Sequence, residues 1–229
     1  MKERGPRLAR SLLAIFVSMW VFEAAAGLVT DPPAGLDEPR FFEQLRTMLA
    51  ELSRSEDPVI RRLYETARAS PAAIHVRPMT DDRSTWNSDG TRTRAHTEPD
   101  DRRPKSEGRD KPSDATIFVP PEAVEPGKGF WKSGTLVHEL THAIDLANGR
   151  YNPEVTIRER RATFMQNVWR SHTGATLRTS YHGRFPTLDY QEALRRGALE
   201  EYARQIFTRS DFPMPPSAPP AGGATKDHD

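Results

Sequence analysis

The feature that most constrains the fold is an amphipathic segment at about residues 133–148, which carries both a start and a stop signal for a helix. Its apolar residues recur every three to four positions: Leu136, Leu140 and Ile144 line one face, with Val137 beside it. Ser133 is the expected N-cap, and Gly149 stands where glycine commonly ends a helix. The segment therefore predicts a helix that packs one face against a core.

Two histidines lie one turn apart on this predicted helix. His138 and His142 are separated by four residues, so both imidazoles project from the same side and can share one cation. Glu139 can reach a water on that cation and act as general base. Zinc suits imidazole and carboxylate ligands and leaves one position for water. The H-E-x-x-H pattern thus predicts a Zn2+ site with two histidine ligands and a catalytic glutamate.

A chance occurrence of the pattern on a surface helix is the alternative. The helix signals and the use of two of the chain's seven histidines argue against it. Asp145 lies three residues after His142 on the same face. It either ligates the metal directly or orients a histidine ligand, and the second role is the commoner one for such a neighbour.

A third ligand must come from elsewhere in the chain. From the level between the two histidines to the end of the helix is about eight residues, roughly 12 Å. Asn152 and Pro153 then predict the cap and first position of the next helix. If that helix packs antiparallel, it regains the level of the metal near residues 159–161, where Glu159 is the only acid. The alternative is a solvated Glu159 among the neighbouring arginines.

Three blocks in this region together resemble a known family. They are H-E-L-T-H-A-I-D-L-A-N-G at 138–149, E-R-R-A-T-F-M-Q-N-V-W-R at 159–170 and G-A-T-L-R-T-S-Y at 174–181. The stretch resembles the gluzincin-like zincin peptidase domains of bacterial effector and polymorphic-toxin proteins. The resemblance implies Glu159 as third zinc ligand and Tyr181 as a donor to the oxyanion. His182 is the alternative donor, and a loop residue without a role is the alternative for both.

A competing third ligand lies later in the chain. Glu200-Glu201-Tyr202-Ala203 resembles the E-x-x-A helix that supplies this ligand in lethal-factor-like zincins. The helix that carries it is expected to begin near Thr187, to contain Gly197 and to close the domain. Glu159 and the pair Glu200 and Glu201 therefore remain alternatives at this point.

The remaining periodic segments predict an α+β, mainly helical domain with a small sheet beside the metal-binding helix. One helix is expected at 38–53, and a second begins with Asp57 as N-cap and Pro58 at its first position. Short strands are expected at 74–76 and 116–119, and they can pair with each other. The domain is expected to span residues 36–212.

Composition separates the other segments. Residues 1–26 have a basic start, a short apolar run and Ala24-Ala25-Ala26, which is typical of a cleaved signal peptide. An uncleaved signal anchor is the alternative. Residues 27–35 are expected to be a mobile tether and 213–229 a proline-rich tail. Residues 80–114 are rich in charge and poor in apolar residues, which predicts a disordered insertion.

These features predict a secreted or periplasmic zinc endopeptidase that acts on a protein or peptide substrate. With 33 basic and 32 acidic residues the chain has no basic field for nucleic acid, and we expect a monomer without a membrane span after signal cleavage. A non-catalytic, zinc-stabilised secreted interaction module is the alternative function.

Overall fold

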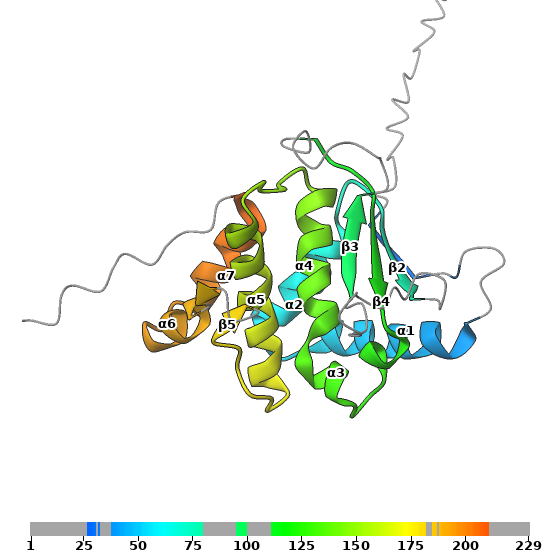
Figure 1. The fold of residues 1–229 in the computed structure, drawn as a ribbon, viewed down its shortest axis with the longest axis horizontal. Helices are drawn as coiled ribbons and strands as arrows, with labels where there is room; N and C mark the ends of the chain where they lie inside the picture. Colours follow the sequence, from blue (N-terminus) through cyan, green and yellow to red (C-terminus); the bar gives the residue numbers. More distant parts are fainter. Residues whose placement is uncertain are drawn as a thin grey trace, which may run out of the picture.

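Figure 1 shows a computed structural model of the chain, in which helices predominate and a small sheet lies to one side. The structure describes residues 27–30, 32, 38–79, 95–99, 111–181, 185–186 and 188–210, with the backbone alone at 181 and 185–186. The predicted signal segment and the predicted tail lie outside these residues. The α+β, mainly helical class is confirmed. Within the described part, no helix combines the length and apolar character needed to cross a membrane.

The main sheet has the strand order β1-β2-β4-β3, and its members are β1 (Leu28–Val29), β2 (Ile74–Pro78), β3 (His96–Pro99) and β4 (Ala115–Val119). The two strands expected from the sequence are β2 and β4, and they pair directly and in parallel. β1 extends the sheet in parallel beside β2, whereas β3 pairs antiparallel with β4. The predicted pairing of two short strands is confirmed.

Two of the short strands differ from what the sequence led us to expect. β1 falls in the segment expected to be a mobile tether, and Gly27 ties it further by donating its N–H to Ser70 O at 3.1 Å. β3 falls inside the segment 80–114 expected to be disordered. Backbone hydrogen bonding to β4 orders β3 although the surrounding composition is poor in apolar residues. The rest of that segment up to residue 110 lies outside the described residues.

The N-terminal helices α1 (Pro39–Arg54) and α2 (Pro58–Arg68) agree with the sequence. Asp57 caps α2 by accepting the N–H of Val59 at 2.8 Å and of Ile60 at 3.3 Å. The apolar faces of both helices enter one buried cluster with the inner face of the sheet and the later helices. Described residues from 41 to 207 contribute to this cluster, which supports a single domain.

The histidine-bearing helix is α4 (Thr135–Ala147), and it packs against β3 and β4 on one side and against α5 (Val155–His172) on the other (Figure 1). Ser133 is not its N-cap, because this residue ends the short helix α3 (Gly129–Ser133). The cap is Gly134, at φ +69°. At the other end Gly149 follows the cap as expected, with Arg150 N–H donating to Asp145 O at 2.7 Å.

Gly134 allows α3 to turn tightly into α4. A Cβ at this position would lie 2.9 Å from Trp169 Cδ1. That indole is fixed, since its Nε1–H donates to Trp131 O at 2.7 Å. The site therefore requires glycine both for its left-handed backbone and for space.

We expect Gly134→Ala to lower the free energy of unfolding by about 2–3 kcal/mol, combining backbone strain with overpacking. Gly174→Ala is the matched control, because Gly174 has φ +68° but a Cβ added there would meet no atom within 4 Å. It should lose only the strain, about 1–2 kcal/mol. Urea denaturation measures both. Equal losses would contradict the close approach of Trp169.

The C-terminal part differs from the expected single closing helix. A two-stranded hairpin of β5 (Ser180–Tyr181) and β6 (Phe185–Pro186) is followed by α6 (Asp189–Arg195) and α7 (Leu199–Thr208). Gly197, at φ +64°, ends α6 and separates the two helices. The expected start of α5 at Asn152 and Pro153 is also early, because Asn152 Oδ1 caps the turn by accepting the N–H of Glu154 at 2.9 Å.

Candidate metal centre

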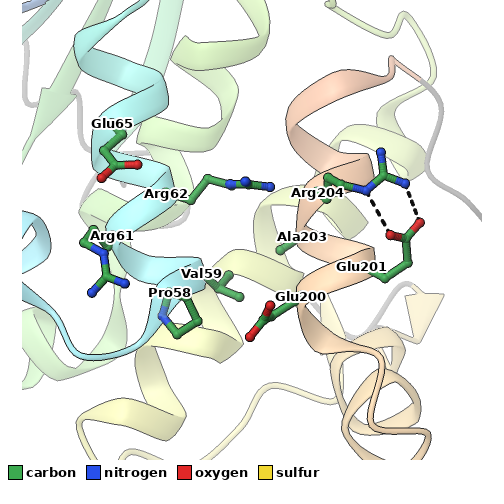
Figure 2. Close-up of a pocket in the computed structure, with 9 residues that line it drawn as sticks. All are labelled: Pro58, Val59, Arg61, Arg62, Glu65, Glu200, Glu201, Ala203 and Arg204. Carbon is green, nitrogen blue, oxygen red and sulfur yellow. Dashed lines mark hydrogen bonds and ion pairs between the residues drawn. The ribbon is translucent and has the colours of Figure 1, made fainter.

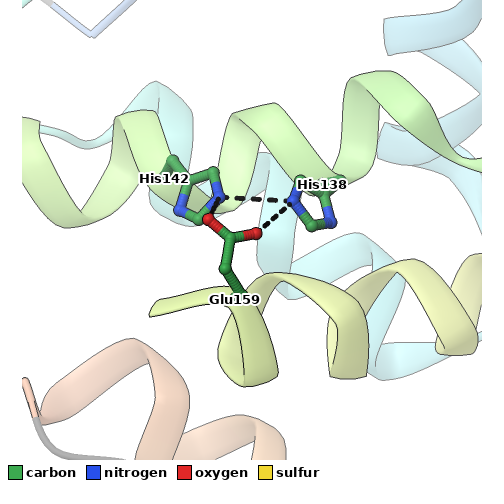
Figure 3. Close-up of side chains that lie close together, drawn as sticks. All are labelled: His138, His142 and Glu159. Carbon is green, nitrogen blue, oxygen red and sulfur yellow. Dashed lines mark hydrogen bonds and ion pairs between the residues drawn. The ribbon is translucent and has the colours of Figure 1, made fainter. Parts of the chain in front are cut away.

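Three side chains from two neighbouring helices converge in the space between α4 and α5 (Figure 3). His138 Nε2 and His142 Nε2 lie 3.3 Å apart. The carboxylate of Glu159 faces both rings, with Oε2 at 3.1 Å from His138 Nε2 and Oε1 at 3.5 Å from His142 Nε2. The three groups can hold a metal ion, since their ligand atoms all lie within 4.8 Å of one another.

The antiparallel return of α5 produces this arrangement. Near one end of the helix pair formed by α4 and α5, Glu159 faces the histidines. Towards the other end of this helix pair, Gln166 Nε2 donates to Ser133 O at 2.7 Å. The expectation that Glu159 regains the level of the histidines is confirmed. Its role as a metal ligand stays a prediction.

The arginines around Glu159 are engaged elsewhere, so the alternative of a solvated, arginine-paired glutamate is wrong. Arg158 Nη1 donates to Asn152 O at 2.8 Å, and Arg160 Nε donates to Asp189 at 3.0 Å. Arg161 pairs with Asp145. Glu159 itself is only 9 % exposed and directs its carboxylate at the imidazoles.

The carboxylate of Asp145 is bound by an arginine, and its expected role beside the metal stays a prediction. Its two carboxylate oxygens accept Arg161 Nε at 2.9 Å and Nη2 at 2.7 Å in a bidentate pair. Arg161 is fully buried and also donates to Ile206 O at 2.6 Å. This pair therefore joins α4, α5 and α7. A buried guanidinium without this carboxylate would be strongly destabilising.

The groups of the cluster shift one another's protonation. Burial alone opposes ionisation of Glu159, but the hydrogen bonds and charges of the two histidines outweigh it and hold the pKa of Glu159 well below its usual value. Burial also opposes protonation of His142. The hydrogen bond to Glu159 and the surrounding carboxylates outweigh it and raise the pKa of His142 above 6.5. The metal-free protein thus keeps an ionised carboxylate between two imidazoles.

Glu139 lies in the same cavity but is not one of the three converging groups. Thr97 Oγ1 lies 2.8 Å from Glu139 Oε2 and 3.1 Å from Glu139 O, and its hydroxyl donates to this residue. Thr97 belongs to β3, and it was not predicted from the sequence because it lies in the segment expected to be disordered. Residues 96–99, His-Thr-Glu-Pro, show no alternation of apolar and polar residues that would predict a strand.

The cavity at the cluster has a volume of about 160 Å³. Beyond the converging groups and Glu139, its walls include His96, Thr97, Tyr151 and Arg158. Tyr151 and Arg158 come from the α4–α5 connection and the first turn of α5, and neither had a role predicted from the sequence. The ring of Tyr151 lies under the guanidinium of Arg158, whose Cζ is 4.6 Å from the ring centroid.

The structure does not bring Glu200 and Glu201 to the histidines. Both line a separate groove between α2 and α7, together with Arg62 and Arg204 (Figure 2). Glu201 is paired with Arg204 of its own helix at 2.6 Å. The lethal-factor-like alternative for the third ligand is therefore not supported by the position of α7.

The expected oxyanion donors fall at the limit of the described residues. The backbone of Tyr181 pairs with Phe185 in the β5–β6 hairpin, and its side chain lies outside the described part of the chain. His182 lies outside it altogether. The role of either residue stays a prediction.

The resemblance to zincin peptidases rests on residues 138–181 of this sequence. Neither a protein-family model, nor a curated protein, nor a solved structure matches the chain.

Proposed function

We propose that the chain is a zinc-dependent peptidase that hydrolyses a peptide bond of a protein or peptide substrate. The observation that carries the proposal is the convergence of His138, His142 and Glu159, with Glu139 in the same cavity. Three ligands and one open position are the usual composition of a catalytic zinc site, and an adjacent carboxylate is the usual general base.

The spacing of the three groups fits zinc. With ligand distances of about 2.0–2.1 Å in a tetrahedron, neighbouring ligand atoms are separated by about 3.3 Å. The two histidine nitrogens are 3.3 Å apart, Oε2 of Glu159 lies 3.1 Å from His138 Nε2, and Oε1 lies 3.5 Å from His142 Nε2. With one ligand atom from each residue, all three atoms lie within 4.8 Å of one another, which is close enough for His138, His142 and Glu159 to hold one zinc ion.

Zinc bound here supplies Lewis acidity, which polarises a carbonyl and lowers the pKa of water. Glu139 takes the proton of the attacking water and passes it to the amine nitrogen as the peptide bond breaks. The hydroxyl of Thr97 fixes Glu139 Oε2, which leaves Oε1 for this transfer. The buried pair of Asp145 and Arg161 keeps α4 and α5 in register, so that ligands and base hold their relative positions.

A non-catalytic, zinc-stabilised interaction module is the second candidate, and two observations favour it. One oxygen of Glu139 is already bonded to Thr97. The cavity of about 160 Å³ is also smaller than the roughly 300–1,000 Å³ of most ligand sites. A peptidase of this form would bind its substrate across the mouth of the cavity, with only the reacting groups inside.

Peptide cleavage by the purified protein without residues 1–26 tests the proposal. We expect hydrolysis of a peptide library, loss of more than about 90 % of the activity with a chelator, and recovery with one equivalent of zinc. Mass spectrometry of the products identifies the bonds cleaved. A protein that binds one zinc per chain but cleaves no peptide would overturn the peptidase and favour the interaction module. The secreted or periplasmic location is part of the same proposal, and N-terminal sequencing after export tests it.

A further inference from the structure

Arg158, in the wall of the cavity, forms no ion pair with an acidic side chain of the described residues. Arg158 Nη1 donates to Asn152 O at 2.8 Å and to Pro153 O at 2.9 Å, and the guanidinium lies over Tyr151. These contacts fix the side chain without neutralising it. Among the described residues, no carboxylate forms an ion pair with Arg158, in contrast to Arg160 and Arg161.

The bonds of Arg158 leave donors for a ligand. Both backbone carbonyls are bonded to Nη1, so Nε and Nη2 are without partners in the described part of the chain. These two atoms form the edge of a guanidinium that matches a carboxylate in a bidentate pair. Tyr151 lines the same cavity, and its hydroxyl has no hydrogen bond to a described residue. Arg158 and Tyr151, which both line this small cavity, therefore have donor atoms that are not bonded to described residues.

With zinc bound, the cavity carries a net positive charge that can attract one anion. Zinc carries +2, and the carboxylates of Glu139 and Glu159 together carry −2. Arg158 then gives the cavity a net charge of about +1. A guanidinium held rigidly at a cavity wall loses little side-chain entropy on binding, which strengthens its selectivity.

We propose that Arg158 selects substrates that carry a carboxylate close to the bond to be cleaved. The inference rests on the proposed peptidase function and names its substrate class. The carboxylate is either an acidic side chain flanking the cleaved bond or the C-terminus of the peptide. Both kinds of carboxylate would form the same ion pair with Arg158. An acidic side chain implies cleavage within the peptide, and a C-terminal carboxylate implies cleavage near its end.

Equilibrium binding to the zinc-loaded Glu139→Gln protein tests this inference without hydrolysis. The probes are fluorescent peptides of equal length: one with a central Asp, one with Asn in its place, and the Asn peptide with a free instead of an amidated C-terminus. We expect at least one carboxylate peptide to bind roughly 10- to 100-fold more tightly than the amidated Asn peptide. Preference for the Asp peptide identifies an acidic side chain, and preference for the free terminus identifies an exopeptidase-like site.

The same titrations in Arg158 variants decide whether this residue is responsible. Arg158→Gln should remove the tighter binding of carboxylate peptides while leaving the affinity for the amidated Asn peptide within about twofold. Arg158→Lys keeps the positive charge and should retain part of the preference for carboxylate peptides. Arg62→Gln is the matched control, because Arg62 lines the separate groove of Figure 2. Equal binding of all three peptides, including no detectable binding, overturns the inference. An unchanged preference in Arg158→Gln overturns it as well. Absence of peptide cleavage by the wild type would count against the peptidase alone, since this measurement needs no turnover.

Discussion

Glu139→Gln should lower peptide hydrolysis by about two to four orders of magnitude and leave zinc bound at one equivalent per chain. The amide keeps the size of the side chain and can still bond to Thr97, but it cannot accept the proton of the attacking water. Because Glu139 is not among the three converging groups, the metal content should not change. Turnover of a cleaved peptide and zinc analysis of the purified protein measure the two effects.

Glu65→Gln provides the matched control. Glu65 is an exposed residue of α2 outside the metal cavity, so the same change there should leave turnover within about twofold. Hydrolysis by Glu139→Gln at the wild-type rate would show that another group is the base. Loss of zinc from this variant would instead make Glu139 part of the metal-binding set. The alternative interaction module predicts no turnover to lose, in the wild type or in either variant.

The parts of the fold that follow from local chemistry were predictable. Asp57 before Pro58 predicts the start of α2 because both residues act on the first turn itself. The antiparallel return from α4 to α5 needed only the helical rise and a short connection, and it placed Glu159 beside the histidines. These inferences depend on geometry within about 25 residues of sequence.

The parts that depend on distant partners were not predictable. β3 is ordered by pairing with β4 and by contact with α4, whereas its own residues give almost no strand signal. Asp145 was expected to ligate the metal or to orient a histidine ligand. The sequence does not show that Arg161 lies opposite Asp145 and forms a buried pair with it. Gly197 separates α6 from α7, although it was expected to lie within a single closing helix. Thr97, Tyr151 and Arg158 reach the cavity from three different segments, and no local pattern marks them.

The second large effect concerns the third ligand. Glu159→Ala should weaken zinc binding by about 10²–10³-fold. This corresponds to roughly 3–4 kcal/mol if the apparent binding free energy of a four-ligand zinc site is shared equally among its ligands. Glu201→Ala, in the groove of Figure 2, should leave zinc affinity unchanged. Competition with a chelating dye measures both affinities.

Stability measurements distinguish a zinc ligand from a partner in a metal-free ion pair, provided that the pH is chosen well. The raised pKa of His142 means that its protonation stabilises the metal-free fold fully below about pH 6.5, and that this contribution is lost as pH rises through the folded pKa. The lowered pKa of Glu159 stabilises the fold above about pH 4.5, and this contribution is lost as pH falls through the folded pKa. The metal-free ion pair is therefore strongest between these two values.

Stabilisation by zinc has the opposite pH dependence, because zinc binds deprotonated histidines. Its contribution to the stability of the fold therefore grows as pH rises. Raising the pH to about 8.5 weakens the metal-free pair and strengthens zinc binding. There, Glu159→Ala should lower the unfolding temperature of the zinc-loaded protein much more than that of the chelator-treated protein. An equal loss in both states would make Glu159 a structural partner of the histidines. The metal ligand would then have to be Glu200 or Glu201, which requires α7 to lie against α4 and α5 differently in the zinc-loaded protein. Zinc affinity of Glu200→Ala and Glu201→Ala would decide between those two.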